Sequence, residues 1–460
     1  MFDEPAHSAS AMSTRCLPGP TTFWAIREPT PGEQWRALFE ATWSSYRAWY
    51  LQDGDAARPR LDVARRRLAS HMPELVPTWE RLVELADGDE TAARMLTLWN
   101  PPAFLPGCSQ AVLTGDTPAL VRNYDYRPDL CERVVYSSAF TGRRVLGMSD
   151  CLWGLVDGMN DAGLAVSVAF GGRRGVGEGF GIPLVVRYLL EVAESVVDVE
   201  AVLAGLPVNM SYNLTVLDRD ADAATIFVAP GTRPEVFGLP AATNHRGTTP
   251  DDPEHARAFH SVQRQQVLLN SLQQQPELDA FVAEFLTPPL YNTAYEQGFG
   301  TMYTAVYRPA EGVADFVWPA SSWRRGFDSP SDTCTVTLGA ADDGDAVPRS
   351  GARRQAGPVV RMQTGLDEQP GPAEAREVTS GRDAQDRTPD ELADMARAAI
   401  DGLARSHDPA AFARLLELSQ QVGECLGVSA RNLAAGRSWS GVADLAGTTR
   451  QAAWARWRRC

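Results

Sequence analysis

The sequence contains no lysine, and its 43 strongly basic residues are all arginine. It also has no apolar run of about 18 residues, the length that a membrane-spanning helix requires. The N-terminus lacks the charged flank and apolar stretch of a secretory signal. These absences predict a cytoplasmic protein without a membrane partner. The formal net charge of −15 argues against binding of nucleic acid by the chain as a whole.

Cysteine is scarce, and its spacing excludes two further classes of protein. The seven cysteines form an odd set without a Cys-x-x-Cys pair, at positions 16, 108, 131, 151, 334, 425 and 460. This pattern argues against a disulfide framework and against a zinc site. We therefore expect free thiols and no metal. Most free cysteines act as small apolar side chains, so a catalytic one has to be identified from its neighbours.

Composition and periodicity divide the 460 residues into five segments. We predict a disordered N-terminus (1–30), a helical pro-segment (31–107), a mixed domain of strands and helices (108–338), a disordered linker (339–388) and a helical C-terminal module (389–460). The pro-segment has apolar residues at helical spacing from Trp35 onward. The linker is rich in Gly, Asp, Arg and Pro, a composition typical of disorder.

The central segment alternates groups of strands with pairs of helices. Short apolar runs separated by turn dipeptides predict hairpins, one of them over residues 109–126. Helices are predicted near 182–205, 254–272 and 277–286. The motif GMNDAG is predicted to be a turn without a chemical role. This order of elements predicts an α+β domain in which layered sheets are covered by helices.

Cys108 is the strongest candidate for a nucleophile. Three prolines within residues 101–106 predict an extended, accessible chain before it. Gly107 offers an unshielded carbonyl, which the Cys108 thiol can attack in an N-to-S acyl shift. Cleavage between the two residues would leave Cys108 with a free α-amino group, whose reference pKa of about 8 suits it to accept the thiol proton. Gly107 and Cys108 therefore form a predicted autocleavage site.

The return strand of the hairpin carries polar side chains back toward Cys108. With the turn in TGDT, we expect Arg122, Asn123 and Asp125 to lie beside the thiol. Asp125 could orient the α-amino group, and Arg122 could lower the pKa of the thiol. An ordinary cross-strand ion pair between Arg122 and Asp125 is an equally open alternative.

The order of three motifs resembles a known family. Cys108 followed by RNYD fourteen to seventeen residues later, GMNDAGLAVS at 158–167 and TNH at 243–245 resemble the acyl-CoA:6-aminopenicillanate acyltransferase family, peptidase family C45. Choloylglycine and penicillin V hydrolases are similar over the same motifs. The resemblance spans roughly residues 35–330. It implies a four-layer αββα sandwich of the N-terminal-nucleophile hydrolase type.

The resemblance also implies a reaction and roles for individual residues. The chain would be a zymogen that cleaves itself and then acts as a linear amide hydrolase or acyltransferase, through an acyl-enzyme on Cys108. The expected substrate is a small-molecule acyl amide or an acyl-CoA-like thioester. No organic cofactor is expected, because acyl transfer through a cysteine thiol needs none. Asp125 would orient the amine, Asn244 would stabilise the oxyanion through its amide, and Arg122 and Asn123 would flank the thiol. The motif TNH could instead mark a strand end with a solvated histidine.

One position departs from the family pattern. Relatives have an arginine just before the strand that here reads TMYTAVY, whereas this chain has Gly298 at the corresponding place. Arg324 or Arg325 could substitute for that arginine only if the fold brings them near. Without that arginine, the sequence does not say which positive charge the expected active site contains besides Arg122.

The C-terminal module resembles the helix-turn-helix units of bacterial DNA-binding proteins. Residues 438–458 predict two short helices in a locally arginine-rich tail. Thr449, Arg450 and Gln451 would then face the major groove of duplex DNA, and a homodimer is expected because a single unit binds weakly. A small bundle for protein contacts is the alternative. The missing family arginine and this module favour a rival function, a transcriptional regulator with a ligand-sensing, catalytically impaired domain.

Overall fold

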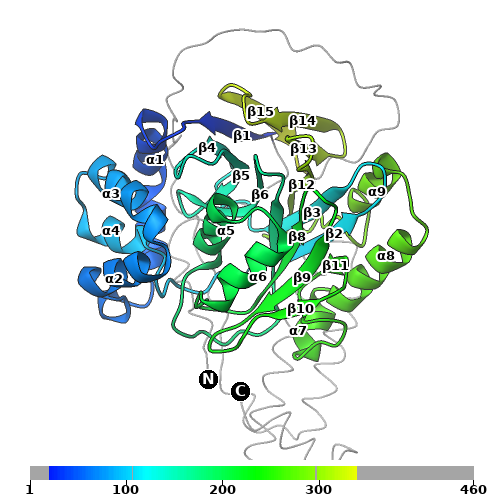
Figure 1. Ribbon diagram of the computed structural model, residues 1–460, viewed down its shortest axis with the longest axis horizontal. Coiled ribbons are helices and arrows are strands. Elements are labelled where there is room, and N and C mark those ends of the chain that lie inside the picture. Colours follow the sequence, from blue (N-terminus) through cyan, green and yellow to red (C-terminus); the bar gives the residue numbers. More distant parts are fainter. Residues whose placement is uncertain (1–19, 106, 296–297, 339–460) are drawn as a thin grey trace, which may run out of the picture. The chain divides into compact units, whose positions relative to one another are not determined.

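Two β-sheets packed face to face form the centre of the part of the chain that the structure describes (Figure 1). The computed structural model describes residues 20–105, 107–295 and 298–338. The predicted linker, the predicted C-terminal module and its proposed DNA-contacting residues Thr449, Arg450 and Gln451 lie outside these ranges. The DNA-binding and dimer expectations therefore stay predictions.

The larger sheet has nine strands within the described ranges. In spatial order they are β10 (Glu235–Phe237), β9 (Ala223–Val228), β8 (Tyr212–Leu217), β7 (Ala165–Phe170), β6 (Gly154–Asn160), β5 (Val145–Asp150), β4 (Val134–Ser138), β1 (Pro20–Arg27) and β15 (Asp332–Thr337). Neighbouring strands are antiparallel except for β1 and β4, which are parallel.

The smaller sheet has six strands, all paired antiparallel. In spatial order they are β11 (Ala241–Ala242), β2 (Gly107–Leu113), β3 (Ala119–Tyr126), β12 (Gly300–Arg308), β13 (Val313–Trp318) and β14 (Ser321–Gly326). The strands β2 and β3 form the predicted hairpin. They pack against β7 and β8 of the larger sheet.

Helices cover the outer face of each sheet (Figure 1). The helices α5 (Ile182–Val192) and α6 (Val196–Ala204) lie on the nine-stranded sheet. The helices α8 (Ser261–Gln273) and α9 (Leu278–Phe285) lie on the six-stranded sheet, and α7 (Pro253–Ala258) contacts α8. The predicted four-layer αββα sandwich is thus confirmed. Because both faces of β2 and β6 are covered, every residue of these strands is buried.

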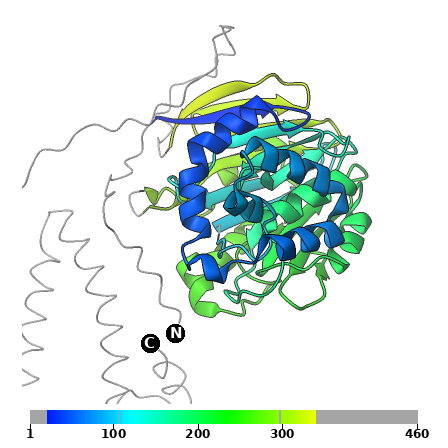
Figure 2. The same cartoon turned by 90° about the vertical axis from the view of Figure 1, so that its left-hand side faces the viewer.

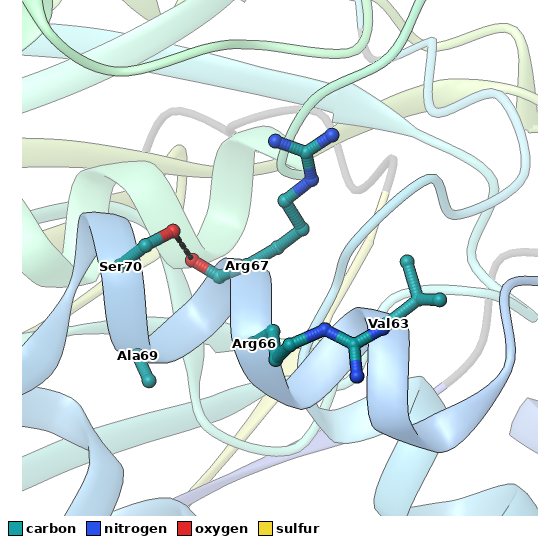
Figure 3. A pocket seen from close by; sticks show the side chains of 5 residues that line it. All are labelled: Val63, Arg66, Arg67, Ala69 and Ser70. Atoms are coloured by element: carbon teal, nitrogen blue, oxygen red, sulfur yellow. Dashed lines mark hydrogen bonds between the residues drawn. The ribbon is translucent and has the colours of Figure 1, made fainter.

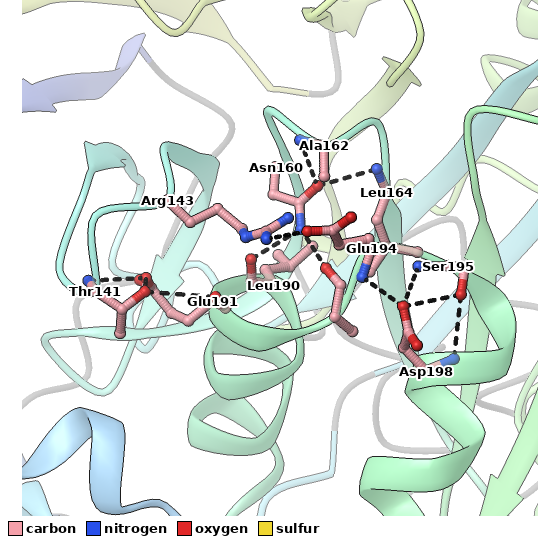
Figure 4. Close-up of polar contacts among 11 residues, drawn as sticks. Thr141, Arg143, Asn160, Ala162, Leu164, Leu190, Glu191, Glu194, Ser195 and Asp198 are labelled. Carbon is pink, nitrogen blue, oxygen red and sulfur yellow. Dashed lines mark hydrogen bonds and ion pairs between the residues drawn. The ribbon is translucent and has the colours of Figure 1, made fainter.

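The predicted turn GMNDAG joins β6 to β7 through a buried asparagine. The Asn160 side-chain oxygen accepts from the N–H groups of Ala162 (3.2 Å) and Leu164 (3.0 Å), and its amide donates to the carbonyls of Leu190 (2.9 Å) and Ala193 (2.8 Å) (Figure 4). Asn160 therefore closes the turn and also binds two otherwise unpaired carbonyls at the end of α5. These are structural contacts, as the sequence predicts.

The segment predicted to be a pro-segment is helical and packs against the larger sheet, and its separation by cleavage stays a prediction. It contains α1 (Glu33–Tyr50), α2 (Leu61–His71), α3 (Val76–Leu85) and α4 (Glu90–Leu96), which face the viewer in Figure 2. The indole N–H of Trp35 donates to the carbonyl of Leu152 (2.9 Å), and that of Trp153 donates to the carbonyl of Leu96 (2.9 Å). None of the helices within the described ranges has the length and hydropathy needed to cross a bilayer.

The prediction that residues 1–30 are disordered is wrong at 20–27. These residues form β1, which pairs with β4 on one side and β15 on the other. Local composition misleads here because the Pro- and Thr-rich surroundings hide the apolar Phe23, Ala25 and Ile26, all of which are buried in the core. The sandwich therefore begins before Cys108, and the predicted domain start at 108 is wrong too.

Candidate active site

Cys108 lies one residue inside β2, with its side chain between the two sheets. It pairs in register with Tyr124 of β3, and Gly107 pairs with Asp125. The Cys108 side chain is fully buried in the intact chain. The hairpin register therefore places the sulfur within reach of side chains from both β3 and the facing sheet.

Arg122 connects the thiol to a carboxylate of the other sheet. Its Nη2 donates to Cys108 Sγ at 2.8 Å, and its Nη1 donates to Asp157 Oδ2 at 2.5 Å. The hydroxyl of Tyr303 donates to the same carboxylate (2.6 Å), as does that of Tyr307. All these side chains are fully buried. The Asp157 carboxylate thus accepts from three donors, and one of them is the Arg122 guanidinium, which it holds beside the sulfur.

Burial and charge act in opposite directions on the thiol. Burial raises the pKa of the Cys108 thiol to about 11, while the positive charges of Arg122 and Arg264 limit the rise. Burial also disfavours the charge on Arg122, but Cys108, Tyr303 and Asp157 together hold the pKa of Arg122 above its ordinary value. The intact chain therefore holds a protonated thiol beside a permanent cation, and this cation stabilises a thiolate once the proton leaves.

The cation Arg264 was not predicted from the sequence. It projects from α8, and its Nη1 donates to the Cys108 carbonyl (2.5 Å) and to Ser109 Oγ (2.7 Å), while its Nη2 donates to Asn244 Oδ1 (2.7 Å). It is buried. Isolated arginines carry little signal in a chain whose basic residues are all arginine, and no motif surrounds this one.

Asn244, which follows β11, lies beside the nitrogen of Cys108. Its Oδ1 accepts from the Cys108 N–H (3.1 Å), and its Nδ2 donates to the carbonyl of Phe170 (3.3 Å). The adjacent His245 is buried, with Nδ1 2.6 Å from Ser261 Oγ and Nε2 3.1 Å from Gln265 Oε1. The alternative of a solvated histidine is therefore wrong.

Asp125 is buried at the end of β3, beside the start of β2. Its Oδ1 accepts from the Thr301 hydroxyl (2.6 Å). Burial raises the pKa of Asp125, and Arg264, the Thr301 hydroxyl and Arg122 oppose the rise. The alternative of an ordinary ion pair between Arg122 and Asp125 is wrong, because Arg122 pairs with Asp157. Residues three apart on one strand point to opposite faces.

The same alternation places Asn123 away from the thiol. Its Nδ2 donates to the carbonyls of Phe285 (2.7 Å) and Leu290 (2.9 Å), and its Oδ1 accepts from the Thr304 hydroxyl (2.7 Å). These partners belong to the outer, helix-covered side of the smaller sheet. The prediction that Asn123 flanks Cys108 is therefore wrong, and the amide instead fixes the segment that follows α9.

The arginines considered as replacements at Gly298 are engaged elsewhere. Arg324 is exposed and forms ion pairs with Asp315. Arg325 donates to the carbonyl of Pro330 and lies near Asp332 (3.7 Å). The second cation beside Cys108 is Arg264, from a helix that the sequence predicts but whose arginine it does not single out.

A hollow on the surface of α2 is separate from these contacts. Val63, Arg66, Arg67, Ala69 and Ser70 line it (Figure 3). Arg66 pairs with Asp62 at 2.9 Å, and Arg67 lies 5.1 Å from the ring centre of Trp99. None of the lining residues contacts Cys108 or the polar groups around it.

Part of the chain matches a known protein family. Residues 112–323 match the family model described as acyl-coenzyme A:6-aminopenicillanic acid acyl-transferase. No curated protein sequence matches the chain.

Three solved structures are similar at low sequence identity. A mutant conjugated bile acid hydrolase from Clostridium perfringens is 12% identical, with 50% of this chain and 96% of that chain covered and a TM-score of 0.35. The penicillin V acylase from Agrobacterium tumefaciens is 13% identical (51% and 92% covered, TM-score 0.35). The Caenorhabditis elegans ortholog of N-acylethanolamine-hydrolyzing acid amidase is 14% identical (44% and 93% covered, TM-score 0.34).

Proposed function

We propose that the protein is a self-processing amide hydrolase or acyltransferase with Cys108 as its nucleophile, a proposal supported by the match of residues 112–323 to the acyl-coenzyme A:6-aminopenicillanic acid acyl-transferase family model. Cys108 precedes the matched residues, so its assignment depends on the geometry around it. The proposed substrate is a small-molecule acyl amide or acyl thioester.

One observation carries the proposal. Both reactive atoms of Cys108 have a polar partner, since Arg122 Nη2 lies 2.8 Å from its sulfur and Asn244 Oδ1 lies 3.1 Å from its nitrogen. An apolar structural cysteine does not need a cation at its sulfur. These two contacts support a role in which the Cys108 sulfur attacks a carbonyl carbon and the Cys108 nitrogen accepts and returns the thiol proton.

In the first reaction the chain is its own substrate. The Cys108 sulfur attacks the carbonyl carbon of Gly107, a C–S bond forms and the C–N bond breaks, and the thiol proton moves to the departing nitrogen. The product is a thioester on Cys108 with a free amine, which Asn244 Oδ1 is placed to hold. Water then attacks the thioester, the C–S bond breaks and a carboxylate forms on Gly107.

In the second reaction the same residue acts on an external acyl group. The free amine accepts the thiol proton, and Arg122 stabilises the resulting thiolate. The thiolate attacks the substrate carbonyl, and the leaving group departs with the proton from the amine. The Nδ2 amide of Asn244 and the guanidinium of Arg264 are the nearby donors that could stabilise the oxyanion. Water or an amine then accepts the acyl group.

Intact-mass measurement of the purified chain tests this proposal. We expect two fragments that part between Gly107 and Cys108, and a single intact chain for Cys108→Ala. Cys131→Ala is the matched control, because Cys131 is another buried thiol of the same domain and should leave cleavage unchanged. An uncleaved wild-type chain would refute the proposal.

A further inference from the structure

Gly107 is confined by the side chain of Phe299. A Cβ atom added at Gly107 would lie 2.7 Å from Phe299 Cζ, 3.0 Å from Phe299 Cε1 and 3.1 Å from the Cβ of Asp125. Real Cβ atoms do not approach other atoms as closely as 2.7 Å. Gly107 is not among the glycines with positive φ. Glycine is therefore required here by space and not by backbone conformation.

Neither neighbour can retreat freely. Asp125 is fixed in β3, where it pairs with Gly107 across the hairpin and accepts from the Thr301 hydroxyl. The Phe299 N–H donates to the carbonyl of Ala294 (3.2 Å), and its ring packs against Phe259 with centroids 5.9 Å apart.

Phe259 is itself held on two sides. Its ring packs against His255, with centroids 4.6 Å apart, and its carbonyl accepts from Arg264 Nε (3.0 Å). The ring of Phe299 therefore packs against Phe259, which in turn contacts Arg264 of the candidate active site.

The chemistry connects this confinement to the choice of substrate. Self-cleavage and substrate turnover pass through the same covalent species, a thioester on Cys108 Sγ. In self-cleavage the acyl carbon is the carbonyl carbon of Gly107, and the carbon next to it is Gly107 Cα. In turnover the acyl carbon of the substrate is bonded to the same sulfur, so the α-carbon next to it must use the space that Gly107 Cα occupies during self-cleavage.

We propose that Phe299 determines specificity at this position, by restricting the enzyme to acyl groups whose α-carbon carries no branch. The inference depends on the proposed function, because it assumes a thioester on Cys108. It adds a substrate class, the unbranched acyl groups, and a residue that selects them.

Self-cleavage provides a test with a known substrate. We expect Gly107→Ala to slow cleavage by about 10- to 100-fold, the usual consequence of forcing one extra methyl group into a filled site. The double variant Gly107→Ala with Phe299→Ala should recover to within about 5-fold of wild type, because the truncated side chain frees that space. Gly107→Ala combined with Phe237→Ala, a matched truncation on β10, should stay slow. Intact mass over time measures wild type, these three variants and Phe299→Ala alone.

Hydrolysis of two synthetic amides provides the second test. Hexanoyl p-nitroanilide has an unbranched α-carbon, and 2-methylhexanoyl p-nitroanilide differs by one methyl group there. We expect wild type to prefer the first in kcat/KM by about 100-fold, and Phe299→Ala to prefer it by less than about 10-fold. Phe299→Leu, which keeps an apolar side chain but lacks the Cζ atom, should give an intermediate preference and guards against loss of folding in the alanine variant.

The outcomes separate this inference from the proposed function. A wild-type chain that never cleaves contradicts both. Wild-type cleavage together with normal cleavage of Gly107→Ala, or a slow double variant whose Phe299→Ala parent cleaves normally, contradicts only the role of Phe299. Equal hydrolysis of the two amides by wild type also overturns it.

Discussion

Asp157 is the residue whose role is least visible in the sequence and most specific in the structure. Its carboxylate accepts from Arg122, Tyr303 and Tyr307, and Arg122 in turn donates to the sulfur of Cys108. Two opposite effects follow for the thiol. The negative charge of Asp157 raises the pKa of Cys108 directly, but by holding Arg122 in place it also keeps a cation at 2.8 Å from the sulfur.

The sign of the pKa change in Asp157→Asn distinguishes these effects. If Asp157 positions Arg122, the variant releases the guanidinium and the pKa of Cys108 rises. Arg122 contacts the sulfur directly, so the loss of its positive charge there outweighs the loss of the more distant negative charge of Asp157. We also expect kcat to fall by about 10- to 100-fold, since a charge-assisted hydrogen bond is lost. The pH dependence of thiol alkylation in the cleaved protein measures this pKa.

A fall in the thiol pKa would contradict the positioning role, because Arg122 would then have stayed in place without its anion. Asp315→Asn is a suitable control, since Asp315 pairs with Arg308 and Arg324 on β13, away from Cys108. This control should leave the alkylation profile unchanged.

At this scale the sequence predicts the residues that motifs mark. Arg122 and Asn244 contact Cys108 and Asp125 pairs with Gly107, as the hairpin register and the order of three motifs lead us to expect. Arg264 could not be predicted, since it reaches the site from a helix more than 150 residues away and no local pattern marks it.

The strand β5 and the helix α1 are joined through a pair of buried carboxyls, Glu132 and Asp150. The hydroxyl of Tyr46 on α1 lies 3.3 Å from Asp150, and the hydroxyl of Ser149 on β5 donates to Glu132 (2.9 Å). Burial raises the pKa of Glu132 to about 8 and that of Asp150 to about 6. We therefore expect the contact between α1 and the sheet to depend on pH.

The pKa of Glu132 in the folded chain lies above that of an unfolded glutamate, so the folded state binds a proton more tightly. Its contribution to stability is present at low pH and is lost as pH rises from about 4.5 to about 8. We expect the free energy of unfolding of wild type to fall over this range, and Glu132→Gln to remove most of the fall. Urea unfolding at a series of pH values measures both.

Glu178→Gln, a substitution at an exposed loop position, is the control and should behave as wild type. If Glu132→Gln kept the pH dependence of wild type, the buried pair could not be its source.

The strand β1 makes the molecule a single sandwich across the proposed cleavage point. It lies N-terminal to Gly107 and yet hydrogen-bonds to both β4 and β15. Its Phe23 is fully buried and contacts the rings of Tyr303 and Trp318. Removing this strand would open the nine-stranded sheet and expose part of the core.

We therefore expect the two fragments to stay together after cleavage. They should co-elute in size-exclusion chromatography and separate in concentrated guanidinium chloride. Phe23→Asp should weaken the association, because it places a charge in the core beside two aromatic rings. Val197→Asp, at an exposed position on α6, should leave it unchanged. Fragments of wild type that separate without denaturant would contradict this expectation.

For the whole domain, the sequence predicts the order of the layers better than the residue at which the domain begins. Hairpins and helix pairs after Cys108 are enough to predict the αββα order, because their periodicities are strong. The position of β1 could not be predicted, since its pairing partners β4 and β15 lie about 110 and 310 residues away in the chain. Long-range pairing of this kind leaves no local signal.

Covalent capture of the acyl-enzyme tests the central claim most directly. The purified protein is incubated with hexanoyl p-nitroanilide, quenched in acid and digested, and the peptides are identified by tandem mass spectrometry. We predict a hexanoyl group on the sulfur of a peptide that begins with Cys108 as a free N-terminus. A hexanoyl group on another residue, or a chain that remains joined between Gly107 and Cys108, would contradict the account.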